Sequence, residues 1–180
     1  MAKSSEIRVT SGKLRGRVLR SPDTSGTHPM GAREKLALFN MVNVEGERVL
    51  DAYAGSGAVG VEALSRGASE VVFVENNRRT ARVILENLQI VGTEGRIFTE
   101  KIGNFAMKGE FLGYFGVILA DPPYTSINIE ELSKLPALLA ENGVLALSSP
   151  AENAEIELLG MRISSTHTYA RARLTIYRRK

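Results

Sequence analysis

The stretch DAYAGSGAVG, at residues 51–60, decides the fold class of this chain. An apolar run from Arg48 precedes it and a helical pattern from Val59 follows it, so the stretch joins a strand to a helix. Gly55 and Gly57 permit a tight turn and let a ligand approach the backbone, and the helix N-terminus offers unpaired N–H groups. A strand, a glycine loop and a helix in this order predict a cofactor site in an α/β fold.

The loop by itself leaves the cofactor open. Gly55, Gly57 and Gly60 match the G-x-G-x-x-G pattern of dinucleotide-binding proteins, so NAD is a candidate. Glu75 ends the next predicted strand, where its carboxylate can accept hydrogen bonds from both ribose hydroxyls of NAD or of S-adenosylmethionine. Asp51 would repel a pyrophosphate, but it suits a ligand that carries a sulfonium and an ammonium group. The alternative for Asp51 is a purely structural hydrogen bond to the loop.

Strands and helices alternate from Glu47 onward. The predicted strands are Arg48–Tyr53, Glu70–Glu75, Arg96–Ile102, Gly116–Asp121 and Gly143–Ser148, and the predicted helices are Val59–Ser65, Arg78–Val91 and Ile129–Ala140. Such alternation predicts right-handed crossovers and a parallel, doubly wound sheet. The last two β-rich runs, Met161–Thr166 and Arg173–Arg178, lie too close for a helical crossover and predict an antiparallel pair. We therefore expect an α/β, Rossmann-like fold whose mostly parallel seven-stranded sheet ends in this pair.

Residues 1–45 precede the alternation. The segment IRVTSGKLRGRVLRSP, at residues 7–22, has the pattern of a basic β-hairpin that turns at Ser11-Gly12 or Arg15-Gly16. A short helix is predicted at Arg33–Val42. We expect these residues to form an N-terminal extension of the same globule, with residues 46–180 as the cofactor-binding domain.

The composition restricts the chemistry. The 180 residues include no cysteine, which excludes disulfides, thiolate zinc sites and cysteine nucleophiles, including the cysteine that methylation at pyrimidine C5 usually needs. His28 and His167 are the only imidazoles, so we expect no metal site. No apolar stretch is long enough to span a membrane, and the first residues lack the pattern of a signal peptide. We expect a soluble, cytoplasmic monomer whose chemistry is supplied by a bound cofactor.

Charge is unevenly distributed along the chain. Residues 1–35 carry a net charge of +5 and residues 162–180 a net charge of +6, although the whole chain carries only +3. Basic ends around an acidic centre favour a polyanionic partner held by the periphery, and nucleic acid is the natural candidate. The alternative is that the basic termini only keep a small protein soluble. The candidate RNA-binding residues are Lys13, Arg15, Arg17 and Arg20.

A second motif, Asp121-Pro122-Pro123-Tyr124, closes the fourth predicted strand. The carboxyl end of that strand borders the crevice where α/β sheets bind ligands. An exocyclic base amine is a poor nucleophile until acceptors hold its N–H bonds, and Asp121 and the Pro122 carbonyl can be those acceptors. Tyr124 offers a face on which an unpaired base can stack. The alternative is an ordinary turn at a strand end.

These motifs belong to a longer similarity that covers nearly the whole chain. It comprises SGKLRGR at residues 11–17, LFN at 38–40, AGSGAVGVEALSRGA at 54–68, Val74-Glu75 and DPPY at 121–124. In these segments the chain resembles the RsmD family of ribosomal RNA methyltransferases, which use S-adenosylmethionine to modify guanine N2 in small-subunit (16S) RNA. The resemblance implies ribosomal RNA as partner, alone or within the small ribosomal subunit.

The resemblance also assigns roles to residues. Candidate catalytic residues are Asp121, Pro122 and Tyr124, and candidate cofactor-binding residues are Asp51, Ala52, Gly55, Ser56, Gly57, Glu75, Asn76, Asn104 and Phe105. Two departures from the family pattern stand out. His28-Pro29-Met30 replaces a usual Arg-Pro-Thr, so a hydroxyl near the amino-acid end of the cofactor is missing, and Asn104 stands where an aspartate often lies beside the adenine.

Three other functions fit parts of the sequence. An adenine-N6 methyltransferase of DNA or RNA is a close alternative, because Asp-Pro-Pro-Tyr serves either amine. An NAD-dependent oxidoreductase fits the glycine loop but leaves Asp121-Pro122-Pro123-Tyr124 and the basic ends unexplained. A non-catalytic RNA-binding module explains the charge but not the cofactor site.

Overall fold

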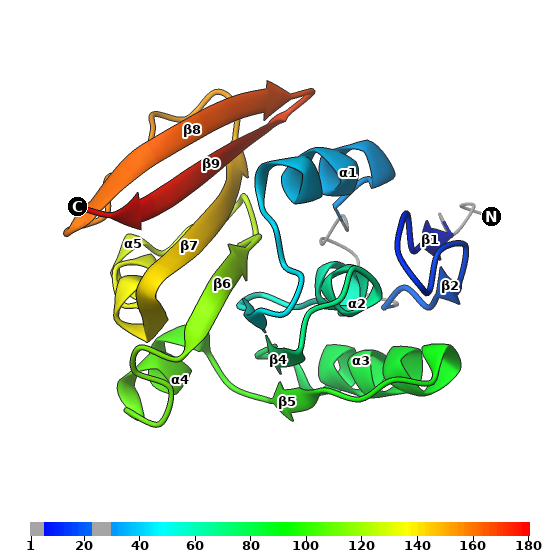
Figure 1. The fold of residues 1–180 in the computed structure, drawn as a ribbon. Coiled ribbons are helices and arrows are strands. Elements are labelled where there is room, and N and C mark those ends of the chain that lie inside the picture. The colour runs from blue at the N-terminus through cyan, green and yellow to red at the C-terminus, as the bar shows by residue number, and fades with distance from the viewer. Residues whose placement is uncertain (1–5, 23–29) are drawn as a thin grey trace.

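A computed structural model describes residues 6–22 and 30–180. Its described part contains a seven-stranded sheet in the order β5-β4-β3-β6-β7-β9-β8 (Figure 1). The strands are β3 (Arg48–Asp51), β4 (Glu70–Val74), β5 (Arg96–Phe98), β6 (Phe115–Ala120), β7 (Leu139–Pro150), β8 (Met161–Tyr169) and β9 (Ala172–Arg179). Neighbours from β5 to β7 pair in parallel, whereas β9 pairs antiparallel with both β7 and β8. The predicted mostly parallel Rossmann-like sheet, with an antiparallel pair at its end, is confirmed.

Helices cover both faces of this sheet. Figure 1 shows α1 (Ala32–Met41), α2 (Ala58–Ser65) and α3 (Arg78–Val91) on one side, and α4 (Ile102–Met107) and α5 (Ile129–Leu132) on the other. Strand side chains alternate between the faces, so each central strand supplies two apolar layers. Val49, Leu119 and Ala146 pack under α1–α3, whereas Leu50, Ile118 and Leu147 pack under α4 and α5. None of the helices in the described part of the chain has the length and apolar character to cross a membrane.

Two predicted elements are wrong in detail. The strand predicted to reach Ile102 ends at Phe98, because Ile102, Phe105 and Ala106 face the core at helical spacing and form α4. This helix has only six residues, too few to give a clear periodic signal. The helix predicted from Ile129 to Ala140 is also shorter. It stops after one turn, Pro136 lies in a 3₁₀ turn η1 (Leu135–Leu138), and Leu139 already begins β7.

The N-terminal segment is attached to α2 by a buried charge. Strands β1 (Ile7–Arg8) and β2 (Val18–Leu19) pair over two residues each, and turns connect them. Between them, Thr10 donates to the Glu62 carboxylate through its N–H and its hydroxyl, at 2.8 and 2.6 Å. Lys35 and Arg66 lie beside the same carboxylate, 3.6 and 3.0 Å from its oxygens, so the buried charge is compensated. The N-terminal extension therefore packs on α2 through specific contacts.

Candidate active site

Three polar side chains lie in a row where β3, β6 and β7 end. Asp51 is the last residue of β3, Asp121 follows β6 directly, and Ser148 lies near the end of β7. Leu119 pairs with Ala146, and two residues further along each strand, Asp121 and Ser148 lie on the same sheet face. Parallel strands end at the same edge of a sheet, so the fold brings these groups together at the edge where α/β proteins bind ligands.

Asp51 is buried at the foot of the glycine loop. Its Oδ2 accepts a hydrogen bond of 2.8 Å from the backbone N–H of Gly60, so the structural role considered for Asp51 is present. Gly60 is needed for packing, since a Cβ there would lie 2.2 Å from the Phe73 ring. Burial and, to a smaller extent, the charges of Asp121 and Glu75 together raise the pKa of Asp51 to about 7, although the hydrogen bond from Gly60 lowers it. A nearby cation would therefore stabilise the ionised form of this carboxyl.

The glycine loop and Glu75 form one unit. Gly55 and Gly57 both have positive φ, of 52° and 77°, and Gly57 is the N-cap of α2. The Gly55 N–H donates to Oε2 of Glu75 at 2.9 Å, and the N–H of Asn77 donates to Oε1 at 2.8 Å. A Cβ on Gly55 would meet no atom within 4 Å, so the loop backbone faces open space there. Burial raises the pKa of Glu75.

The other predicted cofactor residues differ in accessibility. Ala52 and Ser56 are buried, and the N–H of Ala52 donates to Leu119, as in a strand. Asn76 and Asn104 are exposed. Phe105 is buried, and its ring stacks on Phe111 with 4.9 Å between centroids. A ligand can therefore reach Asn104, whereas Phe105 offers almost no accessible surface.

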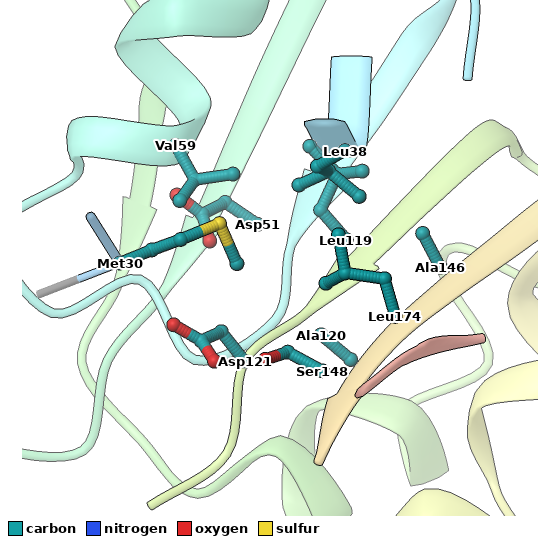
Figure 2. A pocket seen from close by; sticks show the side chains of 10 residues that line it. All are labelled: Met30, Leu38, Asp51, Val59, Leu119, Ala120, Asp121, Ala146, Ser148 and Leu174. Carbon is teal, nitrogen blue, oxygen red and sulfur yellow. The ribbon is translucent and has the colours of Figure 1, made fainter. Parts of the chain in front are cut away.

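Asp121 and Tyr124 meet at a serine that the sequence did not single out. The Tyr124 hydroxyl lies 2.6 Å from Oγ of Ser148, and the Ser148 side chain is directed at the Asp121 carboxyl (Figure 2). Burial and the charge of Glu34 on α1 together raise the pKa of Asp121 to about 6, although Ser148 lowers it. Tyr124 keeps 39% of its surface exposed, so its ring can still take a stacked base. The side chain of Pro123 is exposed and Pro122 is buried.

Met30 fills the space between the two aspartates. In Figure 2 its side chain passes between Val59 and Asp121, and it lines the same small pocket as Asp51. The remaining cavity is about 10 Å³, the lower limit for a single water molecule. A ligand group between Asp51 and Asp121 therefore requires Met30 to move. His28 departs from the family pattern and Pro29 matches it, and both lie outside the described residues.

The site is negatively charged. Among residues 6–22 and 30–180, no lysine or arginine pairs with Asp51, Glu75 or Asp121. The same residues contain no group of carboxylates and imidazoles placed to hold a metal ion. Three carboxyls without a cation at the end of the sheet suit an organic cation and would repel a pyrophosphate.

The predicted RNA-binding residues lie on the N-terminal segment. Lys13, Arg15, Arg17 and Arg20 are all exposed. Arg20 differs from the other three, because its guanidinium lies 2.8 Å from the Glu86 carboxylate of α3. Its charge is thus partly neutralised, which makes it a weaker candidate for binding phosphate.

Asn87 links this segment to the glycine loop, and sequence reasoning missed it. Its Oδ1 accepts from the N–H of Arg20 at 2.7 Å, and its Nδ2 donates to the carbonyls of Arg20 and Ser56 at 3.0 and 2.8 Å. A signal was available, because Asn87 interrupts the buried apolar stripe of α3 beside Ile84 and Leu88. A buried amide in such a stripe indicates a specific partner.

Comparison with known proteins extends these observations. A family model described as conserved hypothetical protein 95 matches residues 7–178. Ribosomal RNA small subunit methyltransferase D of Haemophilus influenzae is 34% identical over 145 residues, which cover 78% of this chain and 74% of that protein. The putative rRNA methyltransferase YlbH of Bacillus subtilis is 30% identical over 185 residues, covering 97% and 100%. The structure of the putative methyltransferase yhhF from Escherichia coli superposes with a TM-score of 0.86 at 26% identity, covering 97% and 98%.

Proposed function

Because this chain belongs to the RsmD family, whose model carries the description conserved hypothetical protein 95, we propose that it methylates the exocyclic N2 amine of a guanine in 16S ribosomal RNA, with S-adenosylmethionine as donor. Relatives named ribosomal RNA small subunit methyltransferase D support the class of substrate. The observation that carries the proposal is the placement of Asp121 and Tyr124 beside the acidic glycine-loop site, at the ends of adjacent strands.

The residues at the glycine loop fit the proposed donor. Gly55 leaves its backbone open, and Glu75 can offer the remaining lone pairs of its carboxylate to ribose hydroxyls. Asp51 and Asp121 would face the positively charged end of the donor and would lose part of their mutual repulsion when it binds. The bound donor supplies an electrophilic methyl group on a sulfonium. The same carboxylates disfavour NAD, whose pyrophosphate carries two negative charges.

Asp121 and Pro122 would hold the target amine. The carboxylate of Asp121 and the Pro122 carbonyl accept the amine hydrogens and direct the nitrogen lone pair, while the Tyr124 ring stacks on the base. Methylation of the nitrogen would require one amine proton to leave. Asp121, with a pKa of about 6, is largely ionised at neutral pH and can accept that proton.

Identification of the methylated nucleoside tests this function. The protein would be incubated with labelled S-adenosylmethionine and either naked 16S RNA or small ribosomal subunits that lack the modification. We expect labelled N2-methylguanosine after nuclease digestion. Labelled N6-methyladenosine would support the adenine alternative, and label in neither RNA substrate would contradict the proposal. Comparison of the two substrates shows whether the enzyme acts on free RNA or on the assembled particle.

A further inference from the structure

Ser148 stands between the two side chains assigned to the target base. It comes from β7, whereas Asp121 and Tyr124 come from the loop after β6, so its contacts depend on the pairing of these strands. The Ser148 side chain is 2% exposed, its Oγ lies 2.6 Å from the Tyr124 hydroxyl, and Figure 2 shows it directed at Asp121. A hydroxyl that is so deeply buried, hydrogen-bonded to Tyr124 and directed at a carboxyl has a fixed orientation.

The chemistry of the three groups fixes the direction of the hydrogen bonds. An ionised carboxylate only accepts, so the single hydrogen of Ser148 points to Asp121. Ser148 then has only its lone pairs to offer, and Tyr124 must be the donor in the 2.6 Å contact. The chain therefore runs from Tyr124 through Ser148 to Asp121, and it ends on the group that receives the target amine.

We propose that Ser148 is a positioning residue that couples Asp121 and Tyr124 into one unit for recognition of the target base. Its hydrogen holds one side of the Asp121 carboxylate and leaves lone pairs for the amine. Its oxygen holds the Tyr124 hydroxyl, which fixes the plane of the ring on which the base stacks. This inference rests on the proposed function, since it assigns Ser148 a part in the same methyl transfer.

The electrostatic surroundings define what loss of Ser148 would do. Among the described residues, Glu34 on α1 raises the pKa of Asp121 by its charge, and Asp51 on β3, which lines the same pocket, is also acidic. Ser148 opposes their effect, because a hydrogen bond donated to the carboxylate stabilises its charged form. Removal of the hydroxyl should therefore raise the pKa of Asp121 and delay its ionisation to higher pH.

Ser148→Ala and Ser149→Ala make a matched pair of variants. The two serines are neighbours on β7 and equally buried, but strand alternation places Ser149 on the other face of the sheet. Rates of methyl transfer to 16S RNA would be measured from pH 5 to 9, with donor affinity by calorimetry. For Ser148→Ala we expect kcat to fall on the order of tenfold to a hundredfold, with donor affinity unchanged and the acid limb of the pH profile moved to higher pH. Ser149→Ala should keep the wild-type profile.

Tyr124→Phe adds a test of coupling. If the three groups act as one unit, Tyr124→Phe alone should slow transfer, and the same change made in Ser148→Ala should cost little more. Fully multiplicative losses, or a pH profile of Ser148→Ala that coincides with that of wild type, would overturn the inference. The pKa of Asp121 can also be followed by carboxyl-carbon NMR without any RNA. An upward shift in Ser148→Ala supports the inference even if the wild-type protein methylates no RNA, and an unchanged value contradicts it.

Discussion

The side-chain amide of Asn87 donates a hydrogen bond of 2.8 Å to the backbone carbonyl of Ser56, and this bond ties the glycine loop to α3. The same amide holds the backbone of Arg20, so the N-terminal segment and the loop share one buried residue. A displacement of the N-terminal segment will therefore affect the hydrogen bond that holds the glycine loop.

Asn87→Ala should weaken both attachments. Three hydrogen bonds are lost, and three backbone groups lose this partner: the N–H and carbonyl of Arg20 and the carbonyl of Ser56. We therefore expect the free energy of unfolding to fall by about 2–4 kcal/mol. The affinity for S-adenosylmethionine should fall as well, because the loop is less well held. Denaturant unfolding and calorimetry measure the two effects. Gln89→Ala, on the exposed side of the same helix, is the control and should change neither.

Glu75→Ala should reduce donor affinity through two losses. The ribose hydroxyls lose their acceptor, and the backbone N–H of Gly55 loses the carboxylate that holds the loop. We expect a decrease in affinity on the order of tenfold to a hundredfold, measured by calorimetry with S-adenosylmethionine and with its demethylated product. Glu75→Gln keeps one acceptor oxygen, so its donor affinity should lie between those of Glu75→Ala and the wild-type protein. Tight binding of NAD by the wild-type protein, without binding of the methyl donor, would refute the assignment of the site.

The basic residues of the N-terminal segment should determine the salt dependence of RNA binding. Each phosphate contact that is lost should reduce the slope of log affinity against log salt by roughly 0.7 to 0.9. Arg15→Glu with Arg17→Glu should therefore lower both RNA affinity and slope and leave donor binding intact. Arg20→Gln should have a smaller effect, because Arg20 already pairs with Glu86. An unchanged slope in the Arg15 and Arg17 variant would place the RNA elsewhere on the protein.

Asp51→Asn should have opposite effects on stability and on donor binding. The folded pKa of Asp51, about 7, lies above the ordinary value of 3.8, so its contribution to stability is complete below about pH 4 and is lost as pH rises through 7. Asn can still accept the bond from Gly60 and carries no charge, so the variant should be more stable than wild type at pH 8, by about 1–3 kcal/mol. Its affinity for the cationic donor should be lower at that pH. Thermal unfolding and calorimetry at pH 5.5 and 8 test both.

The sequence predicted those helices and strands that have long apolar patterns of their own. The apolar runs of β4 and β6, and the stripe of α3, each determine an element without reference to the rest of the chain. Helix α4 was missed, because six residues give little periodicity and its Phe105 finds its partners on other elements. Pro136 was a local signal that the helix predicted through Ala140 was too long.

The candidate site likewise contains residues that a local sequence pattern predicts and residues that it does not. Asp51, Gly55, Glu75 and Asp121 were predicted as site residues because each belongs to a motif at the end of a predicted strand. Ser148 could not be singled out, since its importance arises from the pairing of β6 with β7, which brings it beside Asp121. The family resemblance placed Met30 near the amino-acid end of the cofactor, but nothing local in the sequence shows that its side chain lines the pocket with Asp51 and Asp121.

Asp121→Ala should lower methyl transfer by about 10²–10⁴-fold, because the amine loses the acceptor that directs its lone pair and receives its proton. Asp121→Asn keeps a carbonyl oxygen and should retain more activity than Asp121→Ala, since hydrogen-bond acceptance is the first role of the group. Single-turnover rates with 16S RNA and saturating donor at pH 8 measure both, and calorimetry measures donor affinity separately, because Asp121 lies near Asp51 and would also face the cationic end of the donor. Thr125→Ala, in the same loop but exposed, is the control. If Asp121→Ala folds, binds the donor and methylates RNA at the wild-type rate, the motif is a structural turn and the proposed mechanism is wrong.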